Sequence, residues 1–76
     1  MMNHISVEAY AGASYPERPT AVWLEGERLA VTALIRSWRT PDALHFLVEI
    51  ERLGRVELIY KDDDWSLKPM HVHASI

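Results

Sequence analysis

The side chains best suited to binding a partner are tryptophans and arginines that occur between positions 23 and 39 of the 76-residue sequence. Indole rings and guanidinium groups together can stack on single-stranded bases or anchor a protein interface. A structural role is the alternative, in which the tryptophans fill the core and the arginines cover their edges. The sequence favours the structural role, but it makes these residues the candidate binding site. The candidates are Trp23, Arg28, Arg36, Trp38 and Arg39.

Two groups of side chains could ligate a metal ion. Asp62-Asp63-Asp64 is the densest run of charge, but it lacks the ligand spacing of a calcium loop, and aspartate is also a typical turn residue. His71 and His73 have the i, i+2 spacing that places two imidazoles on one face of a strand, with His4 and His45 as conceivable third ligands. A turn and a pair of exposed histidines explain both groups better. We therefore predict no metal and no cofactor.

Signals for catalysis are weak in this chain. It has no cysteine, no Gly-x-Ser-x-Gly elbow and no glycine-rich phosphate loop. A sheet built from so few residues rarely encloses a pocket of the usual ligand size. A pair of buried carboxyl groups stays open as an alternative. The prediction is a protein that is not an enzyme.

Charge and composition narrow the class of partner. The formal net charge of −3 disfavours a protein that mainly binds the phosphate backbone of nucleic acid. No apolar run approaches the ~20 residues of a membrane span, and no secretory signal is evident. A small extracellular domain usually needs disulfides, which this chain cannot form. We predict a cytoplasmic protein that does not enter a membrane.

The elements that carry these residues are predicted to be strands, organised around a hairpin of the apolar runs 44–50 and 56–60. A three-residue loop at Arg52–Gly54 pairs Val48 with Leu58 on one face and gives Gly54 the left-handed conformation. The same register places Leu47 beside Ile59 on the opposite face. A helix over 41–53, with Thr40 as its cap and Pro41 at its first position, is the alternative. The strand interpretation is preferred because the next strand would follow that helix almost without a connection.

The rest of the chain reads as further short strands and turns. Residues 5–10 alternate as in a half-buried strand, and Pro16 and Pro19 predict a loop over 11–19. A hairpin turns at Glu25-Gly26, in a register that pairs Trp23 with Arg28 if the loop has two residues and that turns Trp23 inward if it is longer. A loop is expected over 36–42, and a loose tail over 69–76. Across a four-residue loop at 61–64, Trp65 pairs with Tyr60 and Leu67 pairs with Leu58.

These elements predict an all-β fold, a single domain over 1–76 that is a small antiparallel meander of five to six strands, with a partly closed barrel as one form of it. The order of residues also resembles a family of small uncharacterised bacterial β-domains, of which similar segments occur at the ends of some Y-family polymerase-related proteins. The resemblance covers about Ile5 to Leu67 and implies strands, with a link to DNA repair; the family has no known activity to carry over. It rests on Pro19, Trp23, Gly26, Val31, Trp38-Arg39, Gly54, Glu57-Leu58, Tyr60 and Trp65-Ser66-Leu67.

The function predicted from the sequence is an interaction module that binds another protein or its own copy. Leu47 and Ile59 are the candidate residues for self-association, because a thin sheet with its other face in the core leaves them in water. A twofold homodimer is the simplest closed arrangement. The alternative function is a weak single-stranded nucleic-acid binder linked to DNA repair, which would use the tryptophans and arginines.

Overall fold

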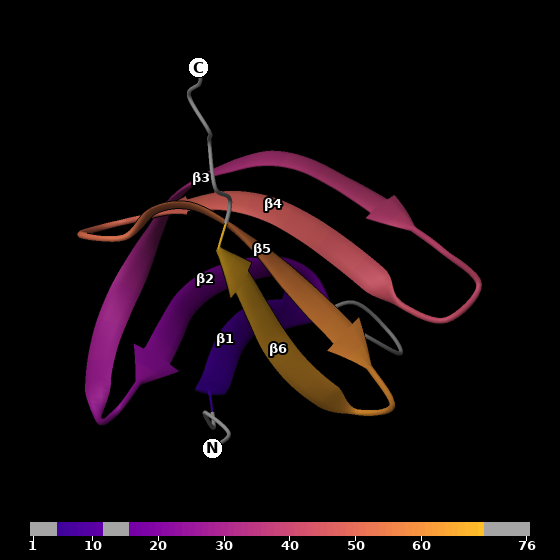
Figure 1. Ribbon diagram of the computed structural model, residues 1–76, viewed down its shortest axis with the longest axis horizontal. Helices are drawn as coiled ribbons and strands as arrows, with labels where there is room; N and C mark the ends of the chain where they lie inside the picture. The colour runs from indigo at the N-terminus through magenta and orange to yellow at the C-terminus, as the bar shows by residue number, and fades with distance from the viewer. Residues whose placement is uncertain (1–4, 12–15, 70–76) are drawn as a thin grey trace.

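The computed structural model describes residues 5–11 and 16–69, and every regular element in them is a strand. The strands are β1 (Ile5–Ala11), β2 (Pro16–Leu24), β3 (Glu27–Arg39), β4 (Leu44–Ile50), β5 (Gly54–Lys61) and β6 (Asp64–Pro69). They form one antiparallel sheet in which the spatial order follows the chain order, β1 to β6 (Figure 1). The predicted all-β meander is confirmed. None of the described residues belongs to a helix that could cross a membrane.

Strand β3 gives the sheet its curled shape. Its first residues pair with β2 as far as Ala30, whereas the residues from Val31 to Arg39 pair with β4. Two β-bulges interrupt the β3–β4 ladder, between Val31 and Ala33 and between Leu34 and Arg36. Bulges bend a strand and increase its twist. The sheet therefore curls into a half-barrel in which the two outer strands, β1 and β6, come into contact (Figure 1).

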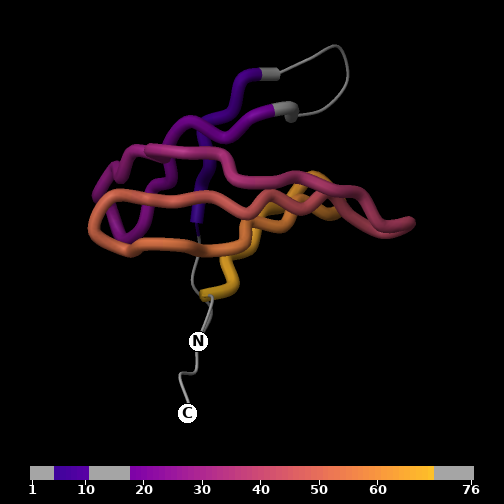
Figure 2. Tube along the Cα trace, turned by 90° about the horizontal axis from the view of Figure 1, so that it is seen from above, coloured from indigo at the N-terminus to yellow at the C-terminus, as the bar shows by residue number. Residues whose placement is uncertain are grey.

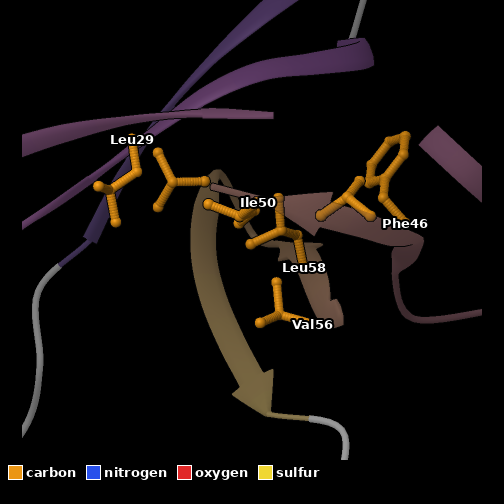
Figure 3. Close-up of a cluster of buried hydrophobic side chains, with 7 residues drawn as sticks. Leu29, Phe46, Ile50, Val56 and Leu58 are labelled. Carbon is orange, nitrogen blue, oxygen red and sulfur yellow. The ribbon is translucent and has the colours of Figure 1, made fainter. Parts of the chain in front are cut away.

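The core lies inside this half-barrel. Alternate residues of β4 and β5 point inward, as the period of two in a strand requires. Figure 3 shows their side chains and that of Leu29 converging on one apolar space. Fully burying a side chain of this size contributes about 1.5–3 kcal/mol to the free energy of folding, so this small cluster stabilises the domain. The buried cluster consists of Val22, Leu29, Phe46, Val48, Ile50, Val56 and Leu58.

The register of the central hairpin differs by two residues from the prediction. Val48 lies opposite Val56, and the loop is Glu51–Leu53 instead of Arg52–Gly54. The predicted left-handed conformation of Gly54 is confirmed, with φ at 79°. Glu51 explains the shift, because its backbone N–H donates to the Ala30 carbonyl oxygen at 3.0 Å and its carboxylate accepts from the Ala30 N–H at 2.8 Å. The loop is thereby fixed to β3, and the even shift leaves the same residues facing inward.

Parts of two predicted loops are strand in the structure. Strand β2 begins at Pro16, so the predicted loop over 11–19 is wrong for residues 16–19. Residues 16–20 pair with β1 alone, and a strand segment that is paired on one side only tolerates proline. Strand β3 continues to Arg39, so the loop over 36–42 is reduced to a tight turn at 40–43. In that turn the N–H of Thr40 donates to the Ala43 carbonyl oxygen at 2.9 Å. The helix alternative over 41–53 is wrong, because pairing with both β3 and β5 holds Leu44–Ile50 as a strand.

The two outer hairpins are paired much as the sequence predicts. Glu25 and Gly26, both with positive φ, form a two-residue turn that sets Trp23 opposite Arg28. Tyr60 pairs with Trp65, and Leu58 pairs with Leu67. The predicted four-residue loop contracts to a two-residue turn at Asp62-Asp63, because Lys61 and Asp64 also pair. Of the predicted tail over 69–76, Pro69 closes β6 and the rest lies outside the described residues.

Candidate functional site

The candidate binding residues fall into separate places along β3. Trp23 and Arg28 pair beside the β2–β3 turn, whereas Arg36, Trp38 and Arg39 lie toward the other end of β3. About 30 Å of extended strand separates Arg28 from Trp38. One ligand of modest size therefore cannot contact them all. The sequence identified suitable residue types but not their distribution.

Trp23 and Arg28 are both bonded to Glu8 of β1. The Trp23 indole Nε1–H donates to Glu8 Oε2 at 2.8 Å, and Arg28 donates through Nε to Oε2 at 3.1 Å and through Nη2 to Oε1 at 2.9 Å. The hydrogen bond from Arg28, followed by that from Trp23, lowers the pKa of Glu8 from its ordinary 4.5 to about 2. Glu8 in turn raises the pKa of Arg28. The cluster joins β1, β2 and β3, and its guanidinium is already matched by a carboxylate.

Trp38 belongs to a second cluster, on the face of β3, β4 and β5 that points away from the core. It lies directly opposite His45 in the β3–β4 ladder. The two rings are stacked, with centroids 5.1 Å apart and planes 4° from parallel. The Arg36 guanidinium carbon lies over the same indole ring, 5.2 Å from its centroid. These contacts occupy ring surface that a stacked nucleic-acid base would need.

His45 connects this stack to a polar relay. Its Nδ1 is 2.8 Å from Glu57 Oε2, and its Nε2 is 3.1 Å from Thr40 Oγ1. The side chains of His45 and Glu57 are each only 15% exposed. Because a carboxylate can only accept, Nδ1 carries the proton, and in neutral His45 the Nε2 accepts from the Thr40 hydroxyl. If His45 is charged, Nε2 donates instead and the hydroxyl proton can turn to the Ala43 carbonyl oxygen, 3.4 Å away.

A hydroxyl, an imidazole and a carboxylate in this order are also the arrangement that activates a nucleophile. Attack on a carbonyl further requires hydrogen-bond donors for the developing oxyanion and space for a substrate. The hollow of about 260 Å³ beside the 40–43 turn is not lined by Thr40 or His45. The relay is explained as a satisfied polar network that fixes the turn and the Trp38 stack. The residues that line the hollow are Arg39, Pro41, Asp42, Ala43, Leu44, Tyr60, Lys61 and Asp62.

Sequence reasoning missed Thr40, His45 and Glu57 as a group. With the predicted register Glu57 would lie opposite Glu49, whereas in the structure Glu49 lies opposite Arg55 and Glu57 opposite Leu47. Only the observed register brings Glu57 next to His45 along the outer face. The signal that could have found it was charge, because opposite charges across a ladder are favoured over like charges.

Leu47 and Ile59 lie on the same outer face as the relay. They are diagonal neighbours rather than the directly opposed pair that was predicted, because Leu47 lies opposite Glu57 and Ile59 opposite His45. Both side chains are half-buried. The predicted apolar pair is therefore interleaved with the polar residues His45 and Glu57. The rows that cross this face are Arg36, Leu47, Glu57 and Lys68, and Trp38, His45, Ile59 and Ser66.

The second half of β3 is an edge of the sheet. Since β2 pairs with β3 only as far as Ala30, the segment Val31–Trp38 is paired with β4 on one side and with no other strand of the described chain. Figure 2 shows β2 diverging from this part of β3. Ile35, at the middle of the segment, is 41% exposed. We call the side of Val31–Trp38 that faces away from β4 the open edge.

The predicted metal-ligating groups have separate outcomes. Asp62 and Asp63 form the β5–β6 turn, and Asp63 accepts a hydrogen bond of 2.9 Å from the Tyr60 hydroxyl, which raises the pKa of Tyr60. His71 and His73 lie outside the described residues. Within residues 5–11 and 16–69, no group of three or more potential ligands is close enough to hold a metal ion.

Comparison of the chain with protein-family models, with curated proteins and with solved structures finds no match. The resemblance to small bacterial β-domains stays a prediction.

Proposed function

We propose that this protein is a non-catalytic interaction module of the cytoplasm that binds an extended protein segment along the open edge of β3. The observation that carries the proposal is the one-sided pairing of Val31–Trp38. An edge strand offers a row of N–H and C=O groups to a further strand, and many recognition domains bind peptides in this way. The absence of cysteine supports the cytoplasmic location.

The side chains of the open edge favour a partner over solvent. Proteins usually protect an exposed edge with proline, lysine, a short strand or a β-bulge, and of these devices this edge has only the bulges of β3. The segment Val31–Trp38 contains neither proline nor lysine, and it carries the exposed apolar Ile35. Arg36 and Trp38 belong to this segment and lie on its outer face, and both are of the residue types enriched at the centres of interfaces.

Binding of single-stranded nucleic acid is less well supported by the same contacts. Arg28 is neutralised by Glu8, and the Trp38 ring is already in contact with His45 and Arg36. The net charge of −3 also opposes phosphate binding. Binding of single-stranded nucleic acid is therefore the weaker alternative.

A displayed library of random linear peptides tests the proposal. Ile35→Lys places a charge on the open edge, and Leu53→Lys is the matched control, because Leu53 lies in the β4–β5 turn and is similarly exposed, at 43% against 41%. We expect the wild type and Leu53→Lys to select extended, β-branched peptides and Ile35→Lys to lose them. Equal selection by all three proteins would refute a binding site on β3. Binding of a labelled oligonucleotide that falls steeply with added salt would instead favour the nucleic-acid alternative.

A further inference from the structure

We infer that the segment that binds the open edge is the same edge of a second copy of this chain, so that two β3 strands pair antiparallel about a twofold axis. This inference rests on the proposed function and names its partner. It would join the β3–β6 portions of two copies into one continuous sheet. Closed twofold pairing is the commonest form of self-association.

The faces of β3 select a register for this pairing. Residues that pair across a ladder share a face of the sheet. Ala33 and Trp38 both lie on the outer face, since they are opposite Glu49 and His45 in the β3–β4 ladder.

Leu34 and Ser37 both lie on the inner face, opposite the buried Val48 and Phe46. An antiparallel pairing that sets Ala33 against Trp38 of the second copy also sets Leu34 against Ser37. Both faces are therefore preserved in a single register, and its axis passes between Ile35 and Arg36.

Charge and side-chain size agree with this register. Arg36 meets Ile35 of the second copy, so the arginines do not face one another, and like charges directly opposite would be unfavourable. The exposed Ile35 is covered in both copies. The large Trp38 meets the small Ala33, and twofold symmetry makes each of these contacts twice. The open edge is thus complementary to the same edge of a second copy. A strand of another protein would need side chains that match the edge equally well at each position.

The register also accommodates the second of the two bulges of β3, the one at Ile35. Ile35 is the extra residue between Leu34 and Arg36 in the β3–β4 ladder. A bulge can turn an edge away from further pairing. In the twofold register the bulges of the two copies lie beside the axis and face each other, so the strands bend together.

Sedimentation equilibrium over a micromolar concentration series tests the inference. The wild type is expected to rise toward twice the chain mass of 8.8 kDa, as is Leu53→Lys, whereas Ile35→Lys is expected to stay at the mass of one chain with an unchanged circular dichroism spectrum. Because the chain has no cysteine, Ile35→Cys should form a disulfide-linked dimer on mild oxidation, and the similarly exposed Leu53→Cys should not.

Three results would overturn the inference. The first is a wild type that stays at the mass of one chain, and the second is an Ile35→Lys protein that still dimerises. The third is a dimer that Leu47→Glu dissociates and Ile35→Lys does not, which would place the interface on the outer face. A monomeric wild type whose peptide selection still depends on Ile35 leaves the proposed function intact and removes only self-pairing. A wild type that neither dimerises nor selects peptides through Ile35 would contradict both the self-pairing and the proposed function.

Discussion

Two substitutions of His45 separate the contributions that its polar contacts and its stack on Trp38 make to the free energy of unfolding. His45→Phe retains an aromatic ring opposite Trp38 but removes both polar contacts, to Glu57 and to Thr40. His45→Ala removes the polar contacts and the stack together. The difference between the two variants therefore isolates the ring contact.

The expected magnitudes follow from burial. Glu57 is 15% exposed, so losing its partner leaves a largely buried carboxylate unpaired, which costs about 1–3 kcal/mol. An aromatic stack adds about 0.5–1.5 kcal/mol. We expect the free energy of unfolding to fall by about 2 kcal/mol in His45→Phe and by about 3 kcal/mol in His45→Ala. A domain of this length has only about 4–11 kcal/mol in total, so either loss is easily measured.

Urea denaturation at pH 7 and one fixed protein concentration measures these changes, since the proposed self-association would make stability depend on concentration. Glu57→Gln is the matched control: its amide oxygen can still accept from Nδ1, so a smaller loss is expected. A His45→Phe protein as stable as the wild type would refute the reasoning, because the relay would then contribute nothing.

Three further predictions concern the fold and its charges. Gly54→Val should lower the free energy of unfolding by about 1–2 kcal/mol in the same urea assay, because φ at Gly54 is 79° and a β-branched residue tolerates positive φ poorly. A Cβ at this position meets no atom within 4 Å, so the cost lies in the backbone conformation and not in a steric clash. An unchanged urea midpoint would argue against this backbone strain. Leu58→Ala should cost about 3–5 kcal/mol, because Leu58 is fully buried, whereas Leu53→Ala in the exposed turn should change the midpoint little. Because the pKa of Glu8 is about 2 in the folded protein and 4.5 ordinarily, the stabilisation from its bonds to Arg28 and Trp23 is complete above about pH 4.5 and is lost as the pH falls toward 2. Thermal melting at stepped pH should show the wild type losing its advantage over Glu8→Gln across that interval; a constant difference would contradict the assignment.

The sequence predicted strand identity better than strand length and register. Alternation identified the inward residues of β4 and β5, but a shift of two residues leaves alternation unchanged, so periodicity could not detect the error in the central hairpin. The bonds between Glu51 and Ala30 decide that register, and they are tertiary contacts. Residues 36–39 read as a loop because they are largely polar, and they become strand only because β4 lies beside them.

The candidate site shows a similar division. Residue type alone selected Trp38 and Arg36, which do lie together on the outer face. The same criterion grouped Trp23 and Arg28 with them, although the length of β3 separates the two pairs. The carboxylate that engages Trp23 and Arg28 comes from β1, and no local pattern around Glu8 indicates it. The open edge of β3 could not be predicted, because it depends on where β2 stops pairing.

The agreement between spatial order and chain order has a consequence for how the domain folds. All-β proteins usually fold slowly, because their strand pairings join distant parts of the chain. Here each ladder joins neighbouring strands, and the turns at Glu25-Gly26 and Asp62-Asp63 have only two residues, so little loop-closure entropy opposes each hairpin. Only the contact of β1 with β6 joins the first and the last described strands, so we expect it to form last and to open first. In stopped-flow kinetics, substitutions in the two-residue turns should therefore slow folding, whereas substitutions between β1 and β6 should mainly speed unfolding.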